Sequence, residues 1–395
     1  MISVTQALEA CLALTTPLDS EEIALQDGLG RVLAAPITAT RNQPPFAASA
    51  MDGYAVASTQ LQAGDQLRVV GEAPAGHMWT GQLHAGEALR IFTGAPVPEG
   101  AARIVIQEDV TREGDVITIS EGFDAGPHIR AAGTDFRVGD TLEAPRRMRP
   151  QDLALAASMN APRLKVARRP QVALIATGDE LVMPGGAPAP DQIIASNTFG
   201  LKAIIEAEGG QARLLPIARD TPESLETVFN LAADADLIVT IGGASVGDHD
   251  LVGRVAEAMG LERAFYKIAM RPGKPLMAGR LGTSAMLGLP GNPVSAMVCG
   301  HLFLVPMLRG FLGLPTGPRR RHMAVLACDL PANGPREHYM RASLEHGTTT
   351  LPQITPFTRQ DSALLSVFSQ AGALMIRPPH QEALTAGSLV EYLTL

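Results

Sequence analysis

Three loops in the middle of the chain combine glycines with carboxylates or cations. They cover residues 176–180, 242–250 and 271–275. Each follows a short apolar run rich in β-branched residues, which is typical of strands buried on both faces of a parallel sheet. In open α/β sheets, ligands bind beyond the carboxyl ends of the strands. The loops therefore predict a site that handles a phosphate, a divalent ion and a nucleotide or oxyanion together.

The second loop has the most pronounced glycine pattern. Its small residues would let backbone N–H groups approach an anion: Gly242, Gly243, Ser245 and Gly247. Asp250 follows them, at the point where a helix is expected to begin. A simple N-cap there would contribute about 1 kcal/mol. The neighbouring glycines favour an anion- or Mg²⁺-binding role for Asp250 instead.

Other acidic positions can be interpreted in two ways. Asp220 and Glu223 form a capping-box pattern, so Asp220 either caps a helix or binds an ion. Asp179 and Glu180 follow a strand and Gly178. They form either a solvated turn or a pair that contacts a ribose hydroxyl, a metal or a proton in transit. From the residues alone, both alternatives stay open.

Cationic and proline-rich loops suggest where an oxyanion would bind. Arg271 and Lys274 lie in a loop that is stiffened by prolines, Pro275 among them. Two cations on a rigid loop suit a tetrahedral oxyanion, although a surface turn is an equal alternative. The turn between Pro290 and Pro293 precedes a predicted helix. That turn would either cap the helix or leave its N-terminus facing an anion.

Three residues nearer the N-terminus belong to turn-like motifs. Asp52 lies in an Asp-Gly turn signal, Thr93 precedes Gly94, and Asp135 would end a bend. Considered one at a time, each is explained by local backbone structure, so none of them predicts a site by itself.

The size and charge of the chain exclude several classes of protein. Its 395 residues predict two to four domains. The formal net charge is −8 and no long basic face is visible, so nucleic acid is not an expected partner. Three widely spaced cysteines form neither a metal site nor a disulfide framework. Without a signal-peptide pattern or an uninterrupted apolar run of about 18 residues, the sequence predicts a cytoplasmic protein with no membrane span.

The elements that must position the loops divide into several parts. Helix and strand patterns alternate from Val172 to Leu312, which predicts an α/β unit. Short strands at regular spacing between Arg41 and Asp135 predict an inserted all-β module, whose flanks would form a stalk-like piece. After residue 318, further β patterns predict a small barrel or sandwich.

Taken in order, the motifs resemble the MoeA family of molybdopterin molybdenumtransferases, which includes the E domain of gephyrin. The match runs from about residue 1 to 318 and more weakly to the end. Six ordered motifs carry it: Ser49-Ala50-Met51-Asp52-Gly53-Tyr54-Ala55, Thr93-Gly94-Ala95-Pro96-Val97-Pro98, Thr177-Gly178-Asp179-Glu180-Leu181, Gly242-Gly243-Ala244-Ser245-Val246-Gly247, Arg271-Pro272-Gly273-Lys274-Pro275 and Leu289-Pro290-Gly291-Asn292-Pro293-Val294-Ser295.

The resemblance implies an elongated homodimer of multidomain α/β plus β class. The expected parts are a stalk-like domain from residues 1–40 and 137–168, an inserted β domain over 41–136, a parallel-sheet α/β molybdopterin-binding domain over 169–316 and a C-terminal β-barrel domain over 317–395. The division made from the residue patterns alone agrees with this arrangement.

The resemblance also implies a reaction. The enzyme would bind adenylylated molybdopterin, take up molybdate and, with Mg²⁺, hydrolyse the phosphoanhydride to release AMP and molybdenum cofactor. The residues that would bind the substrates are Gly242, Gly243, Ser245, Gly247, Pro290, Pro293, Arg271, Pro275, Arg341 and Ser362. Those that would act in catalysis are Glu180, Asp179, Lys274, Asp52, Thr93 and Asp135, the last three from the partner subunit. Asp220 and Asp250 would hold Mg²⁺.

Two other functions fit part of the sequence. One is the adenylyltransferase that acts one step earlier, whose α/β domain shares the glycine-rich loop. The extra β domains and the 271–275 loop argue against it. The other is a scaffold, because gephyrin's E domain also binds receptor tails, but an intact set of acidic and basic residues favours an enzyme. As partners, the resemblance allows an upstream molybdopterin adenylyltransferase and downstream molybdoenzymes or chaperones.

Overall fold

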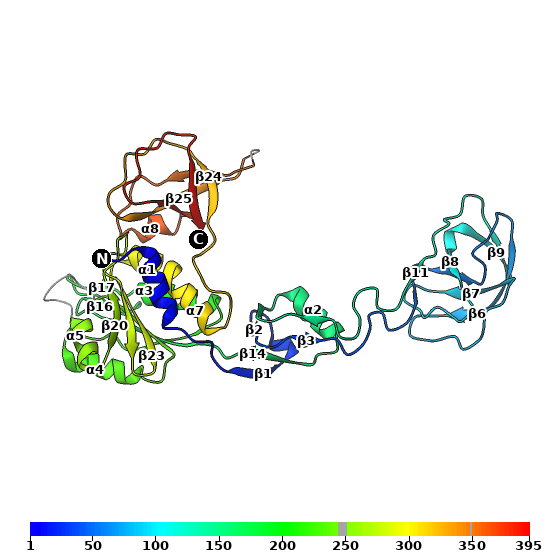
Figure 1. Cartoon of the computed structure of the whole chain (residues 1–395), viewed down its shortest axis with the longest axis horizontal. Helices are drawn as coiled ribbons and strands as arrows, with labels where there is room; N and C mark the ends of the chain where they lie inside the picture. Colours follow the sequence, from blue (N-terminus) through cyan, green and yellow to red (C-terminus); the bar gives the residue numbers. More distant parts are fainter. Residues whose placement is uncertain (244–250, 348–349) are drawn as a thin grey trace.

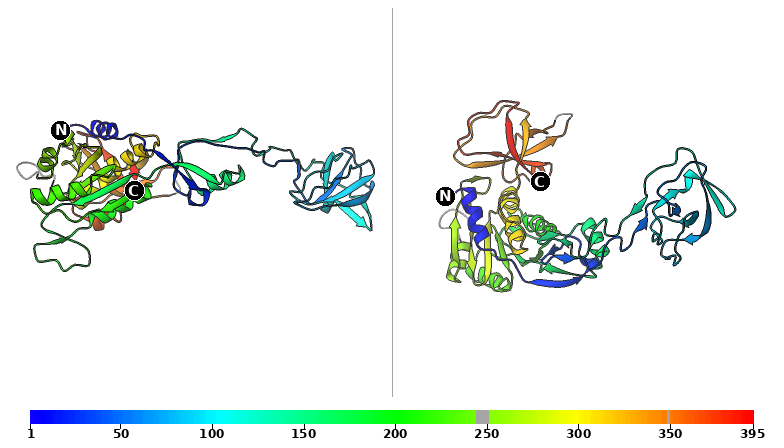
Figure 2. Two further views of the ribbon diagram at one scale, coloured as in Figure 1. Left: turned by 90° about the horizontal axis from the view of Figure 1, so that it is seen from below. Right: turned by 45° about the vertical axis from the view of Figure 1, so that its right-hand side comes forward.

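The computed structural model describes residues 1–243, 251–347 and 350–395 and shows an elongated molecule (Figure 1). A body made of the α/β domain and the C-terminal barrel lies at one end, and a stalk connects it to a separate β domain at the other. Two further views show the same separation (Figure 2). The predicted site residues Ser245, Gly247 and Asp250 lie outside the described residues.

The stalk is built from two segments that are distant in the sequence. Its four strands are β1 (Ser20–Ala24), β14 (Arg163–Ala167), β2 (Val32–Leu33) and β13 (Arg146–Arg147), in that order across the sheet. Helix α2 (Pro150–Ser158) covers the sheet with Ala156, which is fully buried in the stalk core beside Leu33 and Leu164. Two short pairs form the neck that leads outwards: β3 (Ile37–Thr38) with β12 (Thr141–Leu142), and β4 (Ala48–Ser49) with β11 (Ile129–Arg130).

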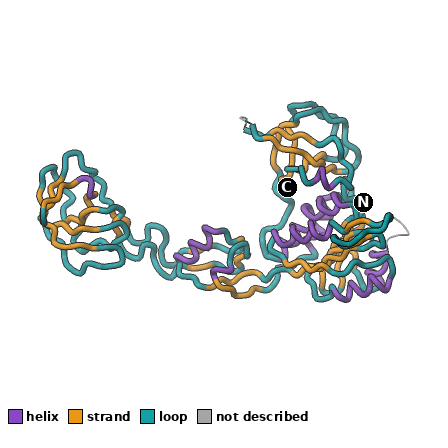
Figure 3. The backbone as a smooth tube through the Cα atoms, turned by 180° about the vertical axis from the view of Figure 1, so that it is seen from behind, coloured by secondary structure: helices purple, strands orange, loops and turns teal. Residues whose placement is uncertain are grey.

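The outer domain is all-β, as its regularly spaced apolar runs predict. Its strands are β8 (Arg103–Ile106), β5 (Gly53–Val56), β7 (Glu87–Ile91), β6 (Gln66–Ala73), β10 (Val116–Ile119) and β9 (Val110–Glu113), in sheet order. Side chains alternate between two buried clusters, so both faces of the sheet are covered. Strands dominate here and in the barrel, whereas helices gather in the α/β domain (Figure 3).

The α/β domain contains a mixed six-stranded sheet. Its strands are β18 (Gln211–Leu214), β15 (Gln171–Ala176), β19 (Leu237–Ile241), β23 (Ser284–Leu289), β22 (Met277–Leu281) and β20 (Glu262–Tyr266). The first four are parallel, as predicted. Strand β22 runs antiparallel to β23, and β20 runs antiparallel to β22, so β22 alone opposes the direction of the other five strands. A short parallel pair, β16 (Leu181–Val182) with β17 (Ile193–Ile194), lies beside the end of β15. The apolar runs locate these strands correctly, but they carry no signal for strand direction.

Helices cover both faces of this sheet. One face is covered by α1 (Val4–Ala13), α3 (Asn197–Ala207), α6 (Pro293–Cys299) and α7 (Val305–Phe311), and the other by α4 (Pro222–Leu231) and α5 (Leu251–Ala258). Helix α1, which begins with a capping box formed by Ser3 and Gln6, packs in the α/β core, although residues 1–40 were expected to belong to the stalk. A π-helical segment, Gly300–Leu304, joins α6 to α7. The combined run Pro293–Phe311 is long and apolar enough to cross a membrane, yet 83% of its most apolar window is buried inside the protein, as in a core helix.

The C-terminal domain is a closed five-stranded barrel. Strands β25 (Glu337–Glu345), β26 (Gln353–Pro356), β24 (His322–Leu326), β28 (Leu389–Thr394) and β27 (Ala373–Arg377) pair in turn, and β27 pairs with β25 to close the ring. Strand β21 (Met270–Arg271) comes from the α/β domain and pairs with β25, which ties the two domains together. Helix α8 (Leu365–Phe368) lies between them and contacts α6.

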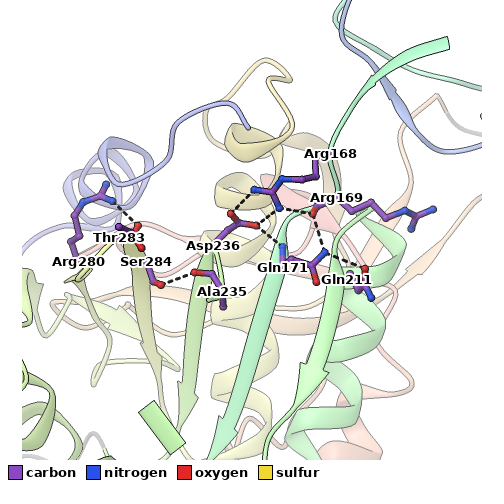
Figure 4. A network of polar contacts seen from close by, with 9 residues as sticks. All are labelled: Arg168, Arg169, Gln171, Gln211, Ala235, Asp236, Arg280, Thr283 and Ser284. Carbon is purple, nitrogen blue, oxygen red and sulfur yellow. Dashed lines mark hydrogen bonds and ion pairs between the residues drawn. The ribbon is translucent and has the colours of Figure 1, made fainter. Parts of the chain in front are cut away.

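Polar contacts at the amino end of the sheet fasten the stalk to the α/β domain (Figure 4). The Arg168 guanidinium donates to both carboxylate oxygens of Asp236, at 2.9 and 2.8 Å. Asp236 also accepts from the backbone N–H of Gln171 at 2.7 Å. Because Arg168 follows the last stalk strand and Asp236 precedes β19, the pair fixes the point where the stalk leaves the sheet, opposite the carboxyl ends.

We expect His301 in the π-helical segment to make the stability of the protein depend on pH. It is largely buried, with its Nδ1 3.2 Å from an Arg319 guanidinium nitrogen, and burial followed by the Arg319 charge lowers its pKa to about 4. An unfolded chain binds this proton near pH 6.5, before the folded one does. We expect the free energy of unfolding to fall by up to about 3 kcal/mol on this account between about pH 6.5 and 4, and not above that window.

Urea unfolding across this pH range measures the effect. The variant His301→Gln should have a flatter profile, whereas His84→Gln, at an exposed position of the outer β domain, should keep the wild-type slope. Equal slopes for His301→Gln and the wild type would contradict the assignment.

Candidate functional site

A cavity of about 940 Å³ lies at the carboxyl ends of β15, β19 and β23. The predicted loops line it together, with Gly178 and Glu180 from the first, Gly242 and Gly243 from the second and Pro275 from the third. The turn over residues 290–293 completes the wall, so predicted residues Pro290 and Pro293 also border the cavity. The sheet therefore brings these loops to one place, as the rule for open α/β sheets requires.

The absence of side chains at Gly242 and Gly243 lets neighbouring residues pack closely against the backbone of this loop. Both residues have positive φ, 94° for Gly242 and 64° for Gly243, a conformation that favours glycine. A Cβ on Gly242 would lie 2.8 Å from the carbonyl oxygen of Thr177, and one on Gly243 only 2.2 Å from Val252 Cγ2. The Gly242 N–H donates to Leu289, so this N–H is not free for an anion, contrary to the expectation from the pattern. Gly242 is required for close packing of the backbone.

Two carboxylates, Glu180 and Asp220, border the cavity, and a third, Asp179, lies next to Asp220. The Asp220 N–H donates to an Asp179 carboxylate oxygen at 3.3 Å. Burial and then the charges of Asp179 and Glu180 raise the pKa of Asp220. The capping-box interpretation of Asp220 is wrong, because Thr221 is the N-cap of α4 and its side chain accepts from the Ser224 N–H. Asp220 is thus available to bind a cation.

The chemistry of these carboxylates suits a hard divalent ion, but the described residues alone do not form a complete ligand set. Asp220 and Glu180 border the cavity, and carboxylate oxygens are the ligands that Mg²⁺ prefers. The unfavourable mutual charge of Asp220, Asp179 and Glu180 is what a bound cation would relieve. Among the described residues, no cluster of three or more His, Cys, Asp or Glu has metal-site geometry by itself. Asp250, the other predicted metal ligand, lies outside that part of the chain.

The predicted oxyanion loop lies where the α/β domain meets the barrel. Arg271 is in β21, opposite His338 of β25, and its side chain is exposed. Lys274 is half-buried, and its carbonyl oxygen accepts from the N–H groups of Ile268 and Leu276. Among the described residues, neither Arg271 nor Lys274 borders the cavity itself, although the adjacent Pro275 does.

Arg341 and Ser362 come from the barrel domain and approach the same junction. Arg341 has no exposed surface, and burial lowers its pKa. Its Nη2 donates to the carbonyl oxygens of Arg359 and Asp361, at 3.3 and 3.0 Å, while within the described chain Nε and Nη1 have no partner. Ser362 Oγ accepts from Asn292 Nδ2 at 3.1 Å, and the Ser362 carbonyl accepts from the Val294 N–H at the start of α6.

The structure does not bring Asp52, Thr93 or Asp135 to the cavity of their own chain. Asp52 accepts from the Thr93 N–H at 2.7 Å and from its hydroxyl at 2.8 Å, and these bonds lower the pKa of Asp52. The flanking strands β5 and β7 lie in the outer domain, far from the α/β domain (Figure 1). Asp135 is exposed in the neck between β11 and β12.

Two residues that the motifs did not single out also border the cavity. Asn197, the first residue of α3, donates from Nδ2 to the Gly291 carbonyl at 2.7 Å and so holds the 290–293 turn in place. Arg254 lies on α5, four residues after Asp250 in the sequence. That spacing could have identified it, because residues four apart lie on the same side of a helix.

Comparisons with known proteins agree with this architecture. Family models match three consecutive parts of the chain: the MoeA N-terminal region (domain I and II) over residues 2–160, a probable molybdopterin binding domain over 173–310 and the MoeA C-terminal region (domain IV) over 323–395. A molybdopterin molybdenumtransferase from Haemophilus influenzae is 33% identical over 395 residues, or 99% of this chain and 98% of the relative. One from Nostoc sp. is 36% identical over 337 residues, or 82% of this chain and 77% of the relative.

Solved structures give the same result. Two structures of the molybdopterin biosynthesis MoeA protein from Pyrococcus horikoshii match this chain with a TM-score of 0.84. They are 31% and 25% identical to it, and each match covers 100% of this chain and 99% or 100% of the other. With three family models in order and relatives above 30% identity over most of its length, the chain belongs to the MoeA family, whose curated members are named molybdopterin molybdenumtransferases.

Proposed function

We propose that this protein inserts molybdenum from molybdate into adenylylated molybdopterin and, with Mg²⁺, hydrolyses the phosphoanhydride to release AMP. Molybdenum insertion into molybdopterin corresponds to the name of the relatives. The adenylylated substrate and the Mg²⁺ requirement rest on one observation. A 940 Å³ cavity has a side-chain-free glycine pair on one side and clustered carboxylates on another, which suits a phosphoanhydride bound together with a divalent cation.

The carboxylates would hold the metal. Asp220, together with Asp250, is proposed as its ligand, while Glu180 and Asp179 orient the attacking water or complete the ligand set. When bound, Mg²⁺ would supply positive charge against the charge that develops on the leaving phosphate. The backbone around Gly242 and Gly243, with Ser245 and Gly247 further along the loop, is proposed to surround the phosphates.

The oxyanion would bind at the junction with the barrel. Molybdate is a tetrahedral dianion, so its oxygens need several hydrogen-bond donors that carry positive charge. Arg271, Lys274 and Arg341 supply such donors, and Ser362 adds a hydroxyl beside the cavity wall. The closed barrel and β21 hold these residues near Pro275, which borders the cavity.

AMP release tests the proposal directly. Adenylylated molybdopterin should release AMP only when molybdate and Mg²⁺ are both present. Tight pterin binding with no release under complete conditions would favour a scaffold. Formation of adenylylated pterin and pyrophosphate from ATP would instead favour the adenylyltransferase.

A homodimer would explain the position of the outer-domain residues. Asp52, Thr93 and Asp135 lie away from the cavity of their own chain, so we propose that each arm completes the site of the partner subunit. Asp52→Asn and Asp220→Asn would then damage different halves of one shared site. After subunit exchange, a mixture of these two inactive variants should recover about a quarter of wild-type activity, because hybrid dimers hold one site without either substitution.

Separate labels on the two variants would show that exchange has taken place. A mixture that exchanges fully and stays as inactive as its parents would contradict the shared site. We also propose that the protein works in the cytoplasm. There it would receive its substrate from an upstream adenylyltransferase and pass its product to downstream molybdoenzymes or chaperones.

A further inference from the structure

We infer that Arg254 is a substrate-binding residue that contacts a phosphoryl oxygen in the cavity. The inference rests on the proposed function, because it takes the cavity to bind a nucleotide phosphate. Arg254 contributes to the cavity wall from helix α5, whose Val252 packs against Gly243. The buried face of α5 is formed by other residues, Val252 and Val255 among them, so the packing of this helix does not require an arginine at position 254.

The charges of the wall support this role. Among the described residues that line the cavity, Arg254 is the one cation, whereas Glu180 and Asp220 are anions. A phosphate bound with Mg²⁺ on the carboxylate side would still carry negative charge on its remaining oxygens. A guanidinium can donate two parallel N–H groups to such oxygens, which makes it the best-suited side chain for this contact.

The partners of other arginines in the α/β domain strengthen the argument. Several of them are engaged: Arg213 with Asp234, Arg263 with Glu257, Arg219 with the carbonyl of Asp179 and Arg280 with the carbonyl of Leu14. Within the described part of the chain, Arg254 makes no such ion pair or hydrogen bond, although it shares the cavity with two carboxylates. Its donors therefore remain available for a ligand, and a phosphate is the anion that the cavity is proposed to hold.

Calorimetric titration of the full-length protein with AMP and with adenosine tests the inference. Arg254→Gln should weaken AMP binding about tenfold or more, since a hydrogen bond to a charged group is lost. It should leave adenosine binding unchanged, and Arg254→Lys should retain part of the AMP affinity. Arg320→Gln makes the same charge change at an exposed site near the barrel linker and should bind AMP like the wild type.

Several results would overturn the inference. They are unchanged AMP binding by Arg254→Gln, an equal loss of AMP and adenosine binding, and a wild-type protein that binds AMP no better than adenosine. The proposed reaction can fail separately, because it is judged by AMP release from adenylylated molybdopterin. A protein that releases no AMP but shows the Arg254-dependent preference for AMP over adenosine would retain the phosphate contact without the reaction.

Discussion

Asp220→Asn should lower the rate of AMP release by about a hundredfold or more, because it removes a charged ligand that is proposed to hold Mg²⁺. The folded protein should not be weakened by this change. The pKa of Asp220 is raised by burial and by Asp179 and Glu180, so its ionised form is disfavoured in the folded state. A neutral amide of the same shape removes that repulsion, and the free energy of unfolding should therefore stay equal or rise slightly.

The neighbouring residue provides a matched control. Thr221 caps α4, and its hydroxyl accepts from the Ser224 N–H at 3.3 Å. Thr221→Ala should lower the free energy of unfolding by about 1 kcal/mol and leave AMP release at saturating substrate close to wild type. Adjacent substitutions would then separate catalysis from stability, when urea unfolding and AMP release are measured on both. An Asp220→Asn protein that is fully active, or as destabilised as Thr221→Ala, would contradict the proposed role.

The N-cap of α4 is a feature that the sequence pattern left ambiguous. The spacing of Asp220 and Glu223 matches a capping box, and this spacing alone suggested that Asp220 begins the helix. Pro222 contains the better signal, because proline is favoured at the first helical position and so makes Thr221 the N-cap. The ambiguity of Asp220 could thus have been resolved from the sequence.

Other features depended on contacts that no local pattern encodes. The apolar runs located the strands of the α/β sheet, but they could not give the reversed direction of β22, because burial on both faces leaves no trace of direction. The pairing of β21 with the barrel likewise joins segments more than sixty residues apart.

The glycine loop shows a third kind of limit. Its pattern predicted backbone N–H groups that could approach an anion, and both described glycines do have positive φ. At Gly242, however, the N–H donates to the carbonyl oxygen of Leu289 within the protein. A sequence pattern can show that side chains are absent, but only the structure shows which backbone donors remain free.

Arg341→Met should abolish the stimulation of AMP release by molybdate, because two or more donors to the oxyanion disappear. We expect the rate of AMP release in the presence of molybdate to fall about a hundredfold. The stability of the fold should change little. Met removes the cost of burying a charge whose Nε and Nη1 have no partner in the described chain, but it also removes the bonds to Arg359 and Asp361. These effects oppose each other, so the free energy of unfolding should stay within about 2 kcal/mol of wild type.

A second variant separates anion binding from support of the loop that carries Ser362. Gln360 holds the same loop, since its Oε1 accepts from the Arg341 N–H at 3.0 Å and its Nε2 donates to the Arg341 carbonyl at 2.9 Å. Gln360→Ala loosens that loop and keeps the guanidinium. A ligand that binds only the folded state raises the melting temperature of the protein. Molybdate should therefore still raise the melting temperature of Gln360→Ala, but not that of Arg341→Met. Equal behaviour of the two variants would show that Arg341 acts by holding the loop, because only a direct contact with the anion depends on the guanidinium itself.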